Sequence, residues 1–169
     1  MSRPLAGIIL IVVLLALAIF IHYQMLDRRK FIAVLHYVSH LDEPVSDWLD
    51  KALLVKELVG VEYGGKMPNL ESSVERYNGI KNRKAEQKPE VVNDAYKALK
   101  AIVARNPEHP GLLQWQKQMN GAYDEFLETV NEYNFYARRY NKKLDTRAGA
   151  LIRDLLHLKY LTVLEDLRL

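Results

Sequence analysis

The chain has 169 residues, 24 Lys and Arg against 21 Asp and Glu, a formal net charge of +3, and no cysteine. The absence of cysteine excludes disulfide bonds, thiol catalysis and every metal site built on cysteine. Because basic and acidic residues nearly balance, the composition does not favour nucleic-acid binding, for which a clustered basic surface is expected.

The most distinctive segment is the run of 23 residues from Pro4 to Leu26, which contains no Asp, Glu, Lys or Arg. As a helix rising about 1.5 Å per residue, it would span roughly 35 Å, enough to cross a hydrocarbon core of about 30 Å. Residues 1–26 are therefore predicted to form an N-terminal membrane anchor. A cleaved signal peptide is the alternative, because residues 16–18 (Ala-Leu-Ala) fit the small-residue cleavage pattern. Cleavage would leave a strongly apolar new N-terminus at residues 19–21, which favours the anchor.

Basic residues flank this run on both sides. Arg3 precedes it, and Arg28, Arg29 and Lys30 follow it. Since Lys and Arg collect on the cytoplasmic side of a membrane helix, the sequence predicts a single-pass protein of the cell membrane. Its N-terminus is expected outside and its C-terminal domain, residues 27–169, in the cytoplasm.

Apolar residues at helical spacing follow in the first part of this domain. The anchor helix is expected to continue to about His40, with Phe31 and Leu35 among the residues of its apolar stripe. Asp42-Glu43-Pro44 predicts the start of another helix, and Gly60 lies where that helix should stop. Residues 61–68 are predicted to form a loop.

Further helices are predicted from capping residues and prolines. Asn69 is expected to be the N-cap of a helix, and Pro89 to mark the start of the next one. The basic residues between Lys81 and Lys88 are interpreted as a solvated helix end. Pro107 and Pro110 are expected to end the helix that starts near Pro89.

The longest apolar stripe runs from Leu112 to Leu144 in steps of three and four, close to the heptad seam of a coiled coil. A last apolar helix is predicted from Leu151, Leu155, Leu158 and Leu161. The expected fold is therefore all-α: an N-terminal transmembrane helix, residues 1–26, followed by a long antiparallel helical bundle in residues 27–169.

Two motifs stand out in this pattern. They are Met67-Pro68-Asn69-Leu70 and the pairs Tyr133-Asn134 and Tyr140-Asn141, which have Arg138-Arg139 between them. These motifs resemble the Pro-Asn-Leu helix entry and the Arg and Tyr-Asn repeats of the LemA family, over about residues 70–160. The Arg-rich approach and the downstream proline of that family are missing here, so the chain resembles a divergent member. The resemblance implies an antiparallel bundle on an N-terminal anchor, with no established enzymatic activity or cofactor.

Residues with catalytic potential are sparse. No paired carboxylates, Gly-rich phosphate loop or Ser-His-Asp order stands at a catalytic spacing, so no enzyme activity and no cofactor are predicted. His36 and His40 are four residues apart on one helix face, which is the spacing of two metal ligands. The alternative function is therefore a membrane-bound enzyme or metal-binding accessory protein that uses these histidines. Such a site needs a third ligand, for which Glu43 is the nearest candidate.

Tyrosine is abundant, with ten residues against four phenylalanines, and several lie on the long stripe. They are expected either to be buried in the bundle or to line an open groove for another helix. The predicted function is a membrane-anchored scaffold or adaptor that binds unidentified protein partners at the cytoplasmic membrane surface, with self-association left open. The residues predicted to contact a partner lie on or beside the long helix: Tyr136, Arg138, Arg139, Lys142 and Lys143.

Overall fold

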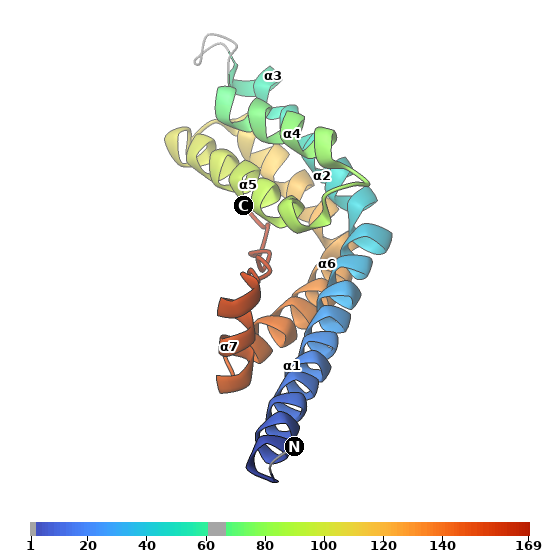
Figure 1. Ribbon diagram of the computed structural model, residues 1–169. Coiled ribbons are helices and arrows are strands. Elements are labelled where there is room, and N and C mark those ends of the chain that lie inside the picture. Colours follow the sequence, from blue (N-terminus) through green and yellow to red (C-terminus); the bar gives the residue numbers. More distant parts are fainter. Residues whose placement is uncertain (1–2, 61–66) are drawn as a thin grey trace. The chain divides into compact units, whose positions relative to one another are not determined.

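The computed structural model describes residues 3–60 and 67–169, and side chains from residue 7 on (Figure 1). Its helical elements are α1 (Arg3–His36), η1 (Tyr37–Leu41), α2 (Asp42–Leu53), α3 (Val55–Val59), α4 (Pro68–Ile80), η2 (Ala85–Gln87), α5 (Lys88–Arg105), α6 (Pro110–Leu144) and α7 (Arg147–Leu156). No strand occurs within the described ranges, and the predicted all-α class is confirmed. Of the predicted loop, residues 61–66 lie outside the described residues.

The chain divides into two compact units. Unit 1 comprises Met1–Ala33 and Tyr136–Leu161, and unit 2 comprises Val34–Phe135 and Thr162–Leu169. Both α1 and α6 run from one unit into the other. The functional division into an anchor of residues 1–26 and a body of residues 27–169 stays a prediction.

In unit 1, α1 carries an apolar surface that other described residues do not cover. Its large apolar side chains between Ile8 and Ile21 are 42–61% exposed. Among the described helices, it is the one long and apolar enough to cross a membrane.

The passage from α1 to α2 is helical without a break. η1 is a π-helical turn that joins the two helices, and α2 begins at the predicted Asp42. The apolar stripe was predicted from Phe31, Ile32, Leu35, Val38 and Leu41. It is wrong at Phe31 and Leu35, which are 62% and 48% exposed, whereas Leu41 is fully buried in unit 2. Tyr37, which the predicted stripe left out, is fully buried as well. The buried side chains of α1 include Leu26 and Ala33, and Tyr37 follows Ala33 by four residues, so the buried face of this helix lies beside the predicted stripe.

The next helices start at prolines. α4 begins at Pro68 with Met67 as its N-cap, so the predicted cap at Asn69 is wrong by two residues. Proline is favoured in the first turn because its missing N–H has no intrahelical partner there in any case. Pro89 follows the first residue of α5, as predicted, and α4 packs along α5 in unit 2 (Figure 1).

The long helix α6 carries the predicted seam. The seam side chains are all buried, so they form core contacts rather than an open groove: Leu112, Trp115, Met119, Tyr123, Phe126, Val130, Tyr133, Ala137, Tyr140 and Leu144. Of the two alternatives for the seam tyrosines, burial and an open groove, the structure supports burial.

The last helix is shorter than predicted. α7 ends at Leu156, because His157 takes a left-handed conformation with φ of 50°. Leu158 and Leu161 therefore lie outside it, in a non-helical segment, residues 158–169, that we call the tail. The predicted apolar face of this helix is also wrong, since Leu151 is 74% and Leu155 64% exposed while Ile152 is buried.

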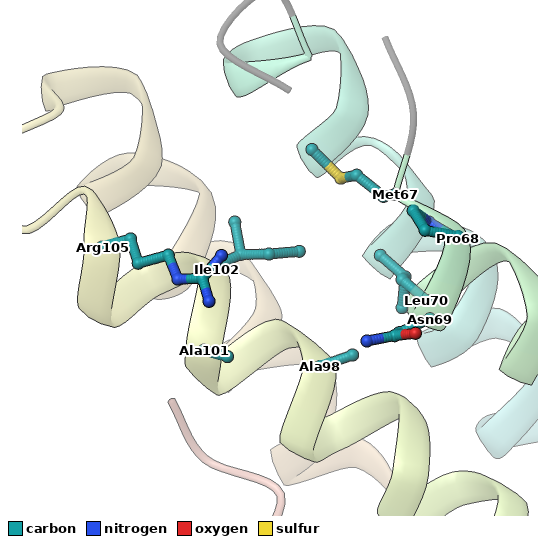
Figure 2. Close-up of a pocket in the computed structure, with 8 residues that line it drawn as sticks. All are labelled: Met67, Pro68, Asn69, Leu70, Ala98, Ala101, Ile102 and Arg105. Carbon is teal, nitrogen blue, oxygen red and sulfur yellow. The ribbon is translucent and has the colours of Figure 1, made fainter. Parts of the chain in front are cut away.

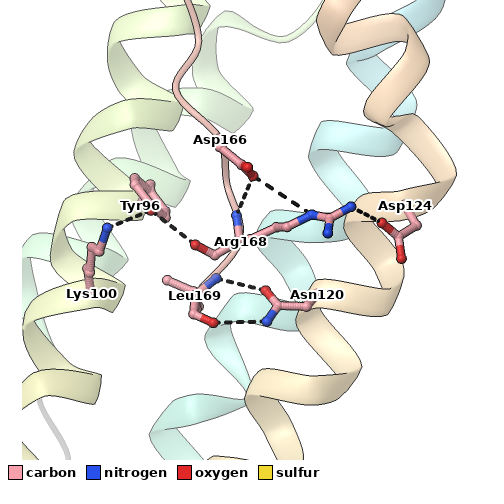
Figure 3. A network of polar contacts seen from close by, with 7 residues as sticks. All are labelled: Tyr96, Lys100, Asn120, Asp124, Asp166, Arg168 and Leu169. Atoms are coloured by element: carbon pink, nitrogen blue, oxygen red, sulfur yellow. Dashed lines mark hydrogen bonds and ion pairs between the residues drawn. The ribbon is translucent and has the colours of Figure 1, made fainter.

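Asparagine side chains of α6 bind the main chain of the tail. In unit 2, the Asn120 amide donates to the Leu169 carbonyl oxygen at 2.9 Å and accepts from its N–H at 2.7 Å (Figure 3). Asn134 pairs in the same two-bond way with Leu164, at 2.9 Å for each bond. In unit 1, Asn141 pairs likewise with Leu161, at 2.8 and 2.9 Å. Each amide thus replaces the hydrogen-bonding partner that a helix or a strand would provide.

The tyrosines that precede two of these asparagines bind the tail as well. In unit 2, the Tyr133 hydroxyl donates to the Thr162 carbonyl oxygen at 2.7 Å. In unit 1, the Tyr140 hydroxyl donates to the Lys159 carbonyl oxygen at 3.3 Å. The two Tyr-Asn pairs therefore have one physical role, which is to hold an extended segment by its backbone.

Substitution of Asn134 tests this role. Asn134→Ala leaves the buried N–H and carbonyl of Leu164 without partners, so we expect a loss of about 2 kcal/mol or more in the free energy of unfolding. Asn131→Ala, an exposed site on the same helix, should change it by less than roughly 0.5 kcal/mol. Urea melts of the full chain in detergent, with hydrogen exchange at Leu164, measure both. Equal losses in the two variants would show that the amide pairing contributes nothing specific.

Candidate functional site

Four predicted site residues meet in a surface pocket of unit 1. Arg28 and Arg29 of α1 lie with Tyr136 and Arg139 of α6 around a cavity of about 320 Å³. Met25 and Ile32 of α1 complete its lining. We call this the juxtamembrane pocket, because it begins where the charge-free run of α1 ends. It brings together residues that the sequence assigned to two separate roles, membrane flanking and partner contact.

The other predicted site residues do not line this pocket. Arg138 and Lys142 are exposed on α6, and Lys143 is half-buried in its last turn. Lys30 is half-buried on α1. The side chain of Arg3 lies outside the described residues.

The juxtamembrane pocket is strongly positive. Three of its six lining residues carry a guanidinium group, and none carries a carboxylate. Neither Arg28 nor Arg29 forms a hydrogen bond or an ion pair with any described residue. Their charges are therefore balanced by solvent or by an external anion.

The histidine pair lies in unit 2. The rings of His36 and His40 are 5.6 Å apart between centroids, which confirms that they share a face. His36 Nδ1 is 3.4 Å from Glu132 Oε1 of α6, whereas Glu43 is exposed. No group of three His, Asp or Glu residues in the described part of the chain is arranged to hold a metal ion. The geometry therefore supplies no third ligand for the metal-binding alternative.

A buried ionic cluster ties unit 2 together around Asp42. The fully buried ammonium of Lys88 lies 3.1 Å from Asp42 Oδ1, and the Tyr77 hydroxyl donates to the same oxygen. The backbone N–H of Asn82 donates to Oδ2 at 3.2 Å. Asn82 reaches this oxygen from a left-handed φ of 64°, which Asn tolerates better than most residues.

Tyrosines around this cluster stay protonated far into the alkaline range. Burial, followed by the charges of its neighbours, raises the pKa of Tyr37 well above its usual value. Burial and the hydrogen bond to Asp42 do the same for the pKa of Tyr77, and burial alone raises the pKa of Tyr133. These phenols act as neutral hydrogen-bond donors and packing groups, not as acids at neutral pH.

Sequence reasoning missed both members of the buried ion pair. Lys88 was interpreted as part of a solvated helix end, but its side chain is 0% exposed. The interpretation holds for Arg83 and Lys84, which are exposed. Lys88 differs from these two residues in its position directly before Pro89, which makes it the first residue of α5. Because α5 packs on α4, a side chain at this position can be buried.

A second pocket, of about 220 Å³, lies between α4 and α5 in unit 2 (Figure 2). The Met67-Pro68-Asn69-Leu70 motif lines one side, and Ala98, Ala101, Ile102 and Arg105 line the other. Its surface is mainly apolar, and Leu70 and Ile102 belong to the core. The motif therefore has a packing role at the start of α4.

Comparison of the chain with protein-family models, curated proteins and solved structures finds no match in any of the three. The functional argument therefore depends on the residues and their geometry.

The Asp42–Lys88 pair gives a direct test of the cluster. Lys88→Met leaves a buried carboxylate without its counter-charge, so we expect a loss of about 3 kcal/mol in the free energy of unfolding. Asp42→Asn should lower the free energy of unfolding by a similar amount, because it leaves the buried Lys88 ammonium without its counter-charge. The double variant should lose clearly less than the sum of the two, since neither charge is then unpaired. Urea melts of all four proteins complete the cycle, and strictly additive losses would contradict a coupled pair.

Proposed function

We propose that this chain is a membrane-anchored helical scaffold or adaptor of the LemA-like type. Residues 1–26 hold it in the cell membrane as a single pass, with the N-terminus outside and the body, an antiparallel bundle, in the cytoplasm. The body binds protein partners at the membrane surface, where confinement to two dimensions raises their effective concentration.

The exposed apolar surface of α1 is the observation that carries this proposal. Large apolar side chains between Ile8 and Ile21 have no cover within the described residues, and this contiguous surface is far more than a soluble monomer usually exposes. A bilayer is the partner that such a surface fits, since the run is long enough to span it.

The position of α7 in unit 1 supports a close approach to the membrane. Ala148, Leu151 and Leu155 of α7 line a pocket of about 230 Å³ with Leu15 and Ile19 of α1. Leu15 and Ile19 lie well inside the charge-free run, so a bilayer that encloses this run would also meet the exposed Leu151 and Leu155 of α7.

The basic strip on α6 supports the partner-binding part of the proposal. Arg138 and Lys142 are exposed, four residues apart on one face, and form no hydrogen bond or ion pair with the described residues. Exposed charges of this kind govern the encounter rate and the choice of partner more than the fold.

The Tyr-Asn pairs, on which the proposed likeness to the LemA family rests, have a structural role in this chain. Tyr133-Asn134 and Tyr140-Asn141 each bind the tail through one hydroxyl and one amide. A repeated structural task of this kind accounts for a repeated motif at a spacing of seven residues.

Single cysteines test the topology, because the chain has no other thiol. With Ser2→Cys and Ser72→Cys, an impermeant thiol reagent on intact cells should label position 2 and spare position 72. Labelling of position 72 alone would reverse the orientation. Loss of residues 1–18 from the mature protein would instead support a cleaved signal peptide.

Charge reversal tests the partner surface. Arg138→Glu with Lys142→Glu should leave helicity and melting nearly unchanged, because both side chains lie off the buried seam. Photo-crosslinking in native membranes should nevertheless lose most of the protein adducts that form at Tyr136 in the wild type. The matched control is Arg83→Glu with Lys84→Glu, which reverses two exposed charges in unit 2. Adducts that persist in the first double variant would remove the basic strip from the proposal, and adducts to a second copy of the chain would identify self-association.

A further inference from the structure

The juxtamembrane pocket has the charge pattern of an anion site. Arg28, Arg29 and Arg139 surround one cavity, and no lining carboxylate offsets their mutual repulsion. Cationic side chains that line one cavity favour an anion that can accept hydrogen bonds from several of them. The two guanidinium groups from α1 have no partner among the described residues, so an incoming anion breaks no existing contact with them.

The donor set suits phosphate better than carboxylate. A guanidinium group presents a planar fork of N–H donors that matches two phosphate oxygens, and three forks can share the oxygens of one phosphate group. Tyr136 adds a hydroxyl to the same lining. A phosphodiester presents two charged oxygens, as a carboxylate does, and its ester oxygens add weaker acceptors for the remaining donors.

The apolar part of the lining points to a lipid as the source of this phosphate. Met25 belongs to the charge-free run of α1, and Ile32 lies two turns further along the same face. The pocket therefore offers apolar surface next to a cationic cluster at the exit of the anchor. Basic pockets at the ends of membrane helices bind anionic lipid headgroups in this way.

We propose that the juxtamembrane pocket binds the headgroup phosphate of an anionic phospholipid. The arginines hold the phosphate oxygens, Tyr136 donates a hydrogen bond, and Met25 and Ile32 contact the glycerol and the first acyl carbons. This inference rests on the membrane anchor of the proposed function, but not on the identity of a protein partner or on the orientation of the chain.

The test uses the full chain, purified in neutral detergent and stripped of lipid. Native mass spectrometry of the chain, titrated with equimolar phosphatidylglycerol and phosphatidylcholine, measures bound lipid directly. We expect retained phosphatidylglycerol in the wild type, and about a tenfold or larger loss of its affinity for each guanidinium removed in Arg29→Gln and Arg139→Gln. Arg29→Lys keeps the positive charge but not the planar fork of donors. Its affinity for phosphatidylglycerol should therefore lie between those of the wild type and Arg29→Gln.

The matched control is Arg83→Gln with Lys84→Gln, which removes two exposed charges from unit 2. An equal loss of lipid in this control would assign the effect to net charge and overturn the pocket. Circular dichroism melts verify that the pocket variants remain folded, and Arg29→Lys serves as the folded substitute if Arg29→Gln melts early.

Two further arms identify the source and the class of ligand. Inorganic phosphate that displaces the lipid at comparable concentration would make this a site for soluble anions and overturn the lipid assignment. Pocket variants that keep full lipid affinity but lose the protein adducts at Tyr136 would make it a protein contact instead. Because Arg138 and Lys142 do not line the pocket, failure of the partner surface and failure of the lipid site give different patterns.

Discussion

Unit 2 depends on one buried carboxylate. Asp42 accepts hydrogen bonds from Tyr77 of α4 and from the backbone at Asn82, and it pairs with Lys88 of α5. Removal of two charges from water is costly, and the attraction between them compensates only when the geometry satisfies the remaining donors and acceptors. Here one side chain at the start of α2 links three helices, so the position of each helix is coupled to the other two. Such a cluster specifies one arrangement of the helices more strongly than apolar packing does.

The elements predicted best from the sequence were those whose ends carry prolines or long apolar runs. Pro89 marks a helix start as predicted, because proline is excluded from the interior of a helix. Pro110 was expected to close the preceding segment and is the first residue of α6, and the α6 seam is visible as a long 3.6-residue period. The stripe at the end of α1 was misjudged because apolar residues occur on two neighbouring faces, and the buried face carries Ala33 and Tyr37 rather than Phe31 and Leu35. Lys88 and Asp42 could not be recognised as a pair, because nothing in a single sequence relates charges 46 residues apart.

The tail shows a different limit of sequence reasoning. Leu158 and Leu161 continue the leucine spacing of α7, which is as compatible with helix as any amphipathic pattern. The helix ends because α6 offers the tail other partners: amide side chains that pair with both main-chain groups, and tyrosine hydroxyls that donate to its carbonyl oxygens. For the candidate site, the sequence supplied Arg28, Arg29, Tyr136 and Arg139 individually. Only the fold showed that they line one cavity.

The dependence of unit 2 on residues 162–169 has a consequence for biosynthesis. Domains generally begin to fold during translation, in order from the N-terminus. Helix α1 leaves the ribosome first, but Asn120 and Asn134 have no tail partner until Leu164 and Leu169 have been translated. Unit 2 is therefore completed only when the tail has been made, and α6 emerges with these asparagine amides unpaired. During this interval any extended segment that reaches α6 can compete with the tail for the same amides.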